Sequence, residues 1–510
     1  MTGISFNNIP GSGLVAPIFT AEVNSGGQYT SQTRFILIGH KTAAGSMALN
    51  TPVAVSAQNQ VDAYAGGGSQ LREMFRIAAQ NAPATNFWIM AIDDSALTAM
   101  VSTITLASIV AGVGTCQICG ETIQIPLTST DTPTTAAAAL AAAINSYYNP
   151  LTQAMLPVTA TSAAGVVTVT ARNKGAMFNE IDFYVDPKII GNVFANTGVW
   201  TLAQTTAGSG TPTTVAAALA TLGDSPADFV VCPWTDSTSL ASYSAWDNDV
   251  SGRWAWSRQS YGHVWSATLG NYSTLTTFAS ALNDRHLTVL GCVSPGANGT
   301  PHGSWLWISA IAARVSTWLS DITTGNVSRA QRGLPVIGLS PPRDASVRPN
   351  FSARNTLLQS GVSTWDVAAD GTIIIDKLVT TYRTGVSGQP DAVFRDVQAL
   401  YQVSGGLSFL RAQLGAQFGQ RSLALKNPGN LGAIATPLDI QSALISYYQQ
   451  LVNQGVFSAA DEFATLLKVQ INAGNPNRVD AFLPLQRVNP LDILAANATV
   501  YQQYPATLTP

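Results

Sequence analysis

Apolar and polar residues in the first hundred positions alternate with the periods of strands and helices. Residues 33–38 and 87–92 are apolar runs of strand length, whereas the apolar residues of 69–80 recur at helical spacing. Two buried strands joined by a helix form a βαβ unit, whose crossover connection makes the strands parallel. We predict that residues 27–100 form the first part of an α/β core.

Residues 101–205 have a different texture, rich in Thr, Val, Ala and Gly. Thr132 followed by Pro133 is a strong start signal for an Ala-rich helix. The patterns predict a ββαββ arrangement with strands 104–110, 116–125 and 181–185, a helix over 134–147 and a hairpin over 158–171. We interpret 101–205 as a β-rich outer domain inserted into the core.

The α/β alternation resumes in residues 206–375. The predicted strands are 228–232, 263–269 and 287–293, and the predicted helices are 213–222 and 274–283. A further helix shows its apolar face in Trp305, Ile308, Ala312, Val315 and Leu319. Such alternation predicts a mainly parallel sheet with helices on both faces, which is a three-layer α/β core.

The best-marked helix of the chain covers residues 437–454. Thr436 is its predicted N-cap, Pro437 occupies the first helical position and Gly455 ends it. Its apolar stripe consists of Ile440, Leu444, Tyr447 and Leu451. The elements predicted around it are helices 392–402 and 408–418, strands 464–471 and 478–485 with a turn at 472–477, and an alternating stretch over 491–501.

The two ends of the chain carry spaced apolar residues without enough of them for a core. Residues 1–26 and 491–510 are therefore predicted to be extended arms that dock on another surface. Between them, residues 376–490 form a C-terminal α+β domain. The predicted fold class is mixed α/β and multidomain: a three-layer core, an inserted β-rich ββαββ domain, a C-terminal α+β domain and terminal arms.

Charge is scarce in this chain. Only 53 of 510 residues are charged, which is 10%, and the net charge is -3. Lysine occurs only six times, so a nucleic-acid partner is not expected, because phosphate binding needs clustered cations. The first residues lack the features of a secretory signal, and the longest apolar stretches fall short of the roughly 20 residues that span a bilayer.

Motifs that would announce catalysis or metal binding are missing from the sequence. It has no nucleophile elbow, no Walker A loop and no dinucleotide fingerprint. Cys116 and Cys119 have redox or metal-ligand spacing, but two ordinary thiols in a hairpin explain them better. The histidines are scattered and are interpreted as structural: His40, His263, His286 and His302. No catalytic, cofactor or metal site is expected.

Two further groups have a chemical interpretation beside a structural one. His302 and Ser304 could form a hydrolase triad with Asp284 or Asp321, although Ser304 is better explained as a helix N-cap. A dense group of tryptophans fits a core or a subunit interface better than a ligand platform. These are Trp234, Trp246, Trp254, Trp256 and Trp265.

Short motifs along the chain resemble, in order, contractile bacteriophage tail sheath proteins of the Mu-like family. The opening Ile4-Ser-Phe-Asn-Asn-Ile-Pro10, with Pro17 and Glu22-Val23, is similar to the start of that family. The C-terminal half contributes Arg354-Asn-Thr-Leu-Leu-Gln-Ser-Gly361, Asp370-Gly371, Thr380-Thr-Tyr382, Pro390-Asp391, Phe394-Arg-Asp-Val397, Ala435-Thr-Pro437, Pro476-Asn-Arg-Val-Asp480, Pro484 and Val488-Asn489.

The resemblance implies a structural subunit without enzymatic activity and without cofactors. Such subunits polymerise as a helical stack of rings around the tail tube, and their contraction drives the tube through the host envelope for genome delivery. The implied partners are further copies of the chain joined by strand exchange, the tail tube protein, and baseplate and tail terminator proteins. Nucleic acid and membrane insertion are not implied. The implied location is the virion, with assembly in the host cytoplasm.

In this family the C-terminal domain, here 376–490, is the inner sheath domain, and the arms join neighbours by strand addition. The residues expected in the arms are Ile4, Phe6, Ile9, Leu491, Ile493, Thr499 and Tyr501. The expected acceptor is the hairpin around 464–485, with Leu466, Val469, Val479 and Phe482. Gln441, Gln449, Asp461 and Glu462 either face the tube or only pack and cap the domain.

Two alternatives belong to other functional classes. Another self-assembling shell, such as a surface-layer protein, shares the low charge but is expected to carry an export signal. An enzyme of the α/β-hydrolase kind is expected to carry a nucleophile elbow, which this sequence lacks.

Overall fold

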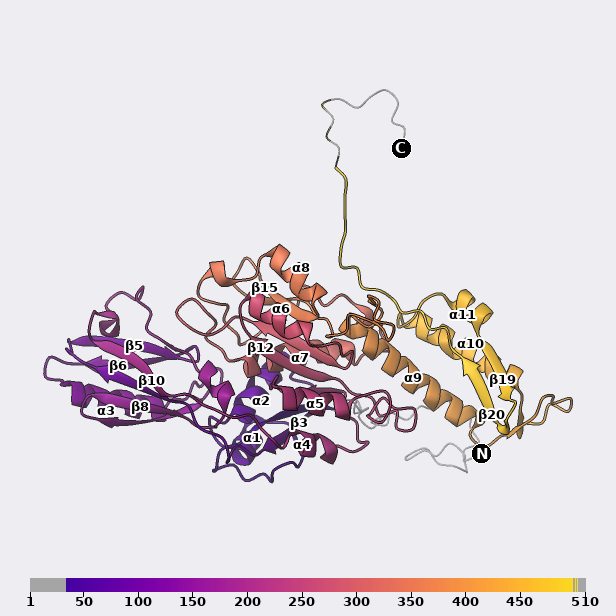
Figure 1. The fold of residues 1–510 in the computed structure, drawn as a ribbon, viewed down its shortest axis with the longest axis horizontal. Helices are drawn as coiled ribbons and strands as arrows, with labels where there is room; N and C mark the ends of the chain where they lie inside the picture. Colours follow the sequence, from indigo (N-terminus) through magenta and orange to yellow (C-terminus); the bar gives the residue numbers. More distant parts are fainter. Residues whose placement is uncertain (1–33, 499, 501, 503–510) are drawn as a thin grey trace, which may run out of the picture.

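The computed structural model of the chain describes residues 34–498, 500 and 502. The predicted N-terminal arm, 1–26, lies outside these residues. Figure 1 shows an elongated molecule with the α/β core in the middle, the 101–206 region at one end and the C-terminal helices and hairpin at the other.

A nine-stranded sheet forms the core, in the order β14-β16-β15-β13-β12-β11-β1-β3-β2. Its six central strands run parallel, because each is reached by a crossover connection. They are β1 (Phe35–His40), β3 (Phe87–Ile92), β11 (Phe229–Val231), β12 (Val264–Leu269), β13 (Leu287–Cys292) and β15 (Val362–Val367). The pairs at both edges are antiparallel and involve β2 (Val53–Val55), β14 (Pro335–Val336) and β16 (Ile373–Lys377).

Helices cover both faces of this sheet. Successive side chains of a strand point to opposite faces, so Phe35 and Leu37 of β1 join one cluster and Ile36 and Ile38 the other. The first face is covered by α2 (Gln70–Asn81) and α7 (Ser304–Leu319), and the second by α4 (Val215–Thr221) and α5 (Ser237–Trp246). The predicted three-layer α/β core is confirmed.

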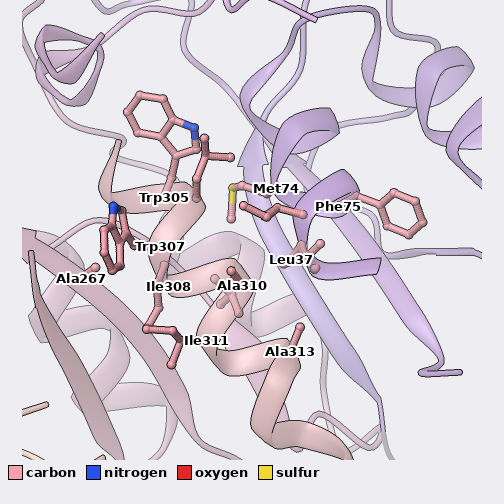
Figure 2. Close-up of a cluster of buried hydrophobic side chains, with 14 of the residues drawn as sticks. Leu37, Met74, Phe75, Ala267, Trp305, Trp307, Ile308, Ala310, Ile311 and Ala313 are labelled. Carbon is pink, nitrogen blue, oxygen red and sulfur yellow. The ribbon is translucent and has the colours of Figure 1, made fainter. Parts of the chain in front are cut away.

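Helix α7 is the centre of the core. Of its 16 residues, 13 are buried, so the helix is enclosed on nearly all sides rather than along one stripe. Figure 2 shows Trp305, Trp307 and Ile308 of this helix among side chains of β1, α2 and β12. The N-cap is Gly303, and Ser304 is the first helical residue, so the prediction of Ser304 as N-cap is wrong.

Three further helices surround the core. They are α1 (Gln58–Ala65), α6 (Tyr272–Ser280) and α8 (Phe351–Gln359). Short 3-10 turns also occur at η1 (Ala176–Glu180), η2 (Val193–Ala195), η3 (Asn326–Ser328) and η4 (Ala345–Val347).

The 101–206 region contains two small sheets and one helix. The first is antiparallel, in the order β10-β4-β8-β7, and the second has the order β6-β5-β9. Helix α3 (Pro133–Asn145) packs against strands of both sheets. The strands are β4 (Val101–Leu106), β5 (Gly112–Ile118), β6 (Glu121–Leu127), β7 (Val158–Ala163), β8 (Val166–Ala171), β9 (Phe183–Tyr184) and β10 (Trp200–Thr206).

The prediction of a single strand over 116–125 is wrong. Cys119 and Gly120 have φ values of 51° and 81° and make a tight turn between β5 and β6. A left-handed backbone conformation interrupts a strand. Gly120 was the only residue in the sequence that signalled this turn. Strand β10 was not predicted at all.

The C-terminal region is built on α9 (Val397–Phe418), one 22-residue helix where two were predicted. Gly405 and Gly406 lie inside it because Ile322 and Phe457 occupy the space a Cβ would need, at 2.6 and 2.5 Å. Packing therefore overrides the low helix propensity of glycine. The other elements are α10 (Pro437–Asn453), α11 (Ala460–Leu466), β17 (Ser422–Leu423), β18 (Ile434–Ala435), β19 (Lys468–Asn472) and β20 (Asn475–Phe482).

Candidate assembly surfaces

The hairpin β19–β20 is a two-stranded sheet whose outer edges pair with no other strand of the described chain. Val469 pairs with Ala481, and Lys468 with Phe482, so these pairs point to opposite faces. Val469 packs against the core cluster, whereas Phe482 is 61% exposed. Unpaired strand edges are ready-made templates for another strand.

The expected hairpin residues divide into two groups. Val469, Val479 and Phe482 lie on the strands of the hairpin. Leu466 instead ends helix α11, so the predicted strand over 464–471 is wrong in its first half. Asp461 and Glu462 lie in the first turn of this short helix, where negative charge is favourable.

The C-terminal segment leaves the body of the molecule near α9 and α10 and runs away from it (Figure 1). Leu491, Ile493 and Leu494 are 74, 83 and 86% exposed. The stretch 491–498 is not part of a sheet in the described chain, because it has no hydrogen-bonded neighbouring strand there. The other expected arm residues, Ile4, Phe6, Ile9, Thr499 and Tyr501, lie outside the described residues.

The expected tube-facing glutamines lie on α10. Gln449 is exposed and its Nε2 donates to Asn453 Oδ1 at 3.0 Å, while Gln441 is half-buried. The predicted cap of this helix is confirmed as a capping box: Thr436 Oγ1 accepts from Asp439 N at 3.2 Å, and Asp439 Oδ2 accepts from Thr436 N at 2.8 Å. Tyr448, not Tyr447, is the fully buried tyrosine of the helix.

Exposed leucines near α10 were not singled out from the sequence. Leu425 and Leu431 in the loop before α10 are 76 and 58% exposed, and Leu438 in its first turn is 71% exposed. The sequence signal that could have indicated their exposure is their isolation in a stretch rich in Gly and Asn.

The hydrolase triad does not form. Ser304 N and Oγ both donate to Glu180 Oε2 at 2.7 Å. Neither ring nitrogen of the buried His302 has a hydrogen-bond partner in the described chain, and burial lowers its pKa to about 3. Asp284 accepts from His286 N, and Asp321 caps the loop after α7.

Glu180 joins the 101–206 region to the N-terminus of α7. Burial of its carboxyl group raises the pKa from 4.5 to about 7, although the Ser304 donors oppose this. Because the pKa is higher in the folded state, the Glu180 carboxyl group makes a contribution to the free energy of unfolding that is fully present below pH 4.5. This contribution is lost as the pH rises through about 7. We therefore expect wild type to lose unfolding free energy relative to Glu180→Gln between pH 4.5 and 8. Urea titrations at several pH values measure this, and a constant difference would contradict it.

The two thiols with redox or metal-ligand spacing lie in the interior of the protein. Cys116 and Cys119 are buried and free, and burial raises the pKa of Cys116 to about 12 and that of Cys119 further. A thiol with such a pKa is a poor nucleophile and ligand. Within the described residues, no cluster of three or more His, Cys, Asp and Glu side chains could hold a metal ion.

The tryptophans serve mainly the core. Trp234, Trp246 and Trp265 are buried, and Trp265 Nε1 donates to Tyr401 OH at 3.2 Å. Trp254 is half-buried, and its Nε1 donates to Gly262 O at 3.0 Å. Trp256 is 84% exposed.

Of the described helices, none is long and apolar enough to pass through a bilayer.

A curated relative matches this chain over nearly its whole length. It is the Mu-like prophage FluMu tail sheath protein of Haemophilus influenzae, 30% identical over 503 residues, which cover 96% of this chain and 98% of that protein. No protein-family model matches the chain.

The solved structures that match this chain share less sequence identity with it. A sheath tail protein from Desulfitobacterium hafniense has a TM-score of 0.48 at 11% identity, covering 93% of this chain and 97% of its own. One from Listeria innocua has a TM-score of 0.43 at 12% identity, with coverages of 90 and 93%. A chain of the anti-feeding prophage baseplate has a TM-score of 0.43 at 10% identity, with coverages of 96 and 100%.

Proposed function

Since the chain belongs to the family of Mu-like tail sheath proteins, we propose that it is the structural subunit of a contractile phage tail sheath. It polymerises into a helical sheath around the tail tube, and contraction of the sheath drives the tube through the host envelope for genome delivery. The observation that carries this proposal is the 30% identity to a tail sheath protein over nearly the full length of the chain.

The geometry of the C-terminal region supplies a physical route to polymerisation. The chain has a hairpin with open edges and a projecting segment with exposed apolar residues. If the segment of one copy adds to the hairpin of the next, main-chain hydrogen bonds provide affinity and alternate side chains set the register. A head-to-tail contact whose rotation does not close generates a helix.

The proposal extends to partners and location. The tail tube protein is the expected partner of the inner surface, to which Gln449, Asp461, Glu462 and the half-buried Gln441 contribute. Baseplate and tail terminator proteins meet the two ends of the polymer. Subunits assemble in the host cytoplasm and function in the virion. The inner sheath domain corresponds to residues 376–490, and the 101–205 domain faces outward.

Electron microscopy of the purified chain, alone and with the tail tube protein, tests the function. We expect helical tubes, or decorated tail tubes in the mixture. A chain that stays monomeric and leaves tail tubes bare, while circular dichroism shows it folded, would contradict the proposal.

A further inference from the structure

The start of the C-terminal segment is attached to the body by neutral hydrogen bonds. Ser458 N donates to Gln486 O at 2.8 Å, and Gln402 Nε2 donates to Val488 O at 2.9 Å. Gln486 N donates to Tyr448 OH at 3.2 Å. These bonds fix the course of the chain as far as Val488.

Asp492 is the last attachment point among the described residues. Its carboxylate pairs with Lys377 Nζ, and its carbonyl oxygen lies 3.5 Å from Arg332 Nη1. Residues 493–498 make no hydrogen bond or ion pair with the rest of the described chain. The direction in which the segment leaves is therefore determined at Asp492.

Lys377 is itself held from the other side. It lies at the end of β16, and its Nζ is 2.9 Å from Oδ1 of Asp396, the N-cap residue of α9. The second oxygen of Asp396 is 3.5 Å from Arg487 Nη2. The Asp396 side chain is only 7% exposed. Charges therefore alternate from Arg487 through Asp396 and Lys377 to Asp492.

This arrangement differs from an isolated surface ion pair. In a partly buried network, water screens the attraction between the charges less and pairing costs less side-chain entropy than in a single exposed pair. Such an exposed pair contributes about 0–1 kcal/mol. The Asp492 side chain is 35% exposed, against 20% for Lys377, so Asp492 is the member that can leave most easily.

We propose that Lys377 is a positioning residue for strand donation: its ion pair with Asp492 directs the C-terminal segment toward the acceptor of a neighbouring copy. This inference rests on the proposed function. Fixing the exit direction in advance reduces the conformational entropy that the segment loses when it docks. Because the outer partner is partly exposed, salt should weaken the pair.

Asp492→Asn in the full chain tests the inference, because it removes the charge at a site that contributes nothing to the core. Spin labels on cysteines introduced at the exposed Ala496 and Ser446 report the exit direction, since the native cysteines are buried. In unpolymerised wild type we expect a narrow distribution of label distances, and in Asp492→Asn a broad one. We expect Asp492→Glu to keep the narrow distribution.

Polymerisation is then followed by light scattering at increasing salt. We expect Asp492→Asn to polymerise about fivefold more slowly at low salt, with a weaker salt dependence than wild type. Asp370→Asn is the matched control, because Asp370 is an exposed turn carboxylate remote in sequence from the segment.

The two readouts separate this inference from the function. Unchanged label distances, or changed distances with an unchanged polymerisation rate, would overturn the role of Lys377 and leave the sheath function intact. A wild-type chain that never polymerises, with or without the tail tube protein, would overturn both.

Discussion

Removal of residues 491–510 is expected to abolish polymerisation and leave a folded monomer. The described part of this segment contributes exposed side chains such as Leu491 and Ile493, so its loss removes little buried surface. Electron microscopy and light scattering measure polymerisation, and circular dichroism with thermal unfolding measures the fold. Deletion of residues 1–22 is expected to act in the same way.

Matched variants separate side-chain recognition from length. Replacing Leu491, Ile493 and Leu494 with Ser keeps the backbone and Asp492 but removes the apolar groups, and we expect it to polymerise as poorly as the deletion. A truncated chain that forms normal sheaths would contradict the arm assignment. A truncated chain that unfolds would instead place the segment in the fold of its own subunit.

Trp307→Ala is expected to lower the unfolding free energy by about 3–5 kcal/mol. The side chain is fully buried in α7, its ring centroid lies 4.8 Å from that of Trp365, and its Nε1 donates to Thr300 Oγ1 at 3.1 Å. Truncation opens a large cavity and removes one of the two hydrogen bonds that the buried Thr300 hydroxyl oxygen accepts, leaving only the one from His302 N. Urea unfolding followed by circular dichroism measures the change.

Trp256→Ala is the control for the same chemical change. Its side chain is 84% exposed, so we expect the unfolding free energy to stay within about 0.5 kcal/mol of wild type. Equal midpoints for the two variants would mean that α7 does not form the core described here. A loss of polymerisation in the stable Trp256→Ala would mark that side chain as a subunit contact.

Elements with strong local signals were predictable from the sequence. Thr436 and Pro437 start α10 where the capping pattern placed it, and the apolar run 87–92 matches β3. Failures occurred where distant residues decide. The Gly405-Gly406 pair reads as a helix break, yet Ile322 and Phe457 pack against it and the helix continues. Local propensity carries no information about such neighbours.

The candidate surfaces divide in the same way. A hairpin around the 472–477 turn and an apolar C-terminal stretch were visible in the alternation of side chains. The bond between Ser304 and Glu180 was not, because 124 residues separate them. Nor was the role of Arg253, whose buried guanidinium donates to the carbonyl oxygens of Gly223 and Ser225. A buried arginine and a surface arginine look alike in a sequence.

By itself, the sequence determined the alternation that makes a three-layer core, the apolar ends and the family of the protein, because periodicity and motif order are properties of neighbouring residues. Only the tertiary structure decided which polar groups meet. It brought Lys377 between Asp396 and Asp492 and left the edges of β19 and β20 open within the described chain. Ion pairs and strand edges depend on residues that are distant in sequence and adjacent only after folding.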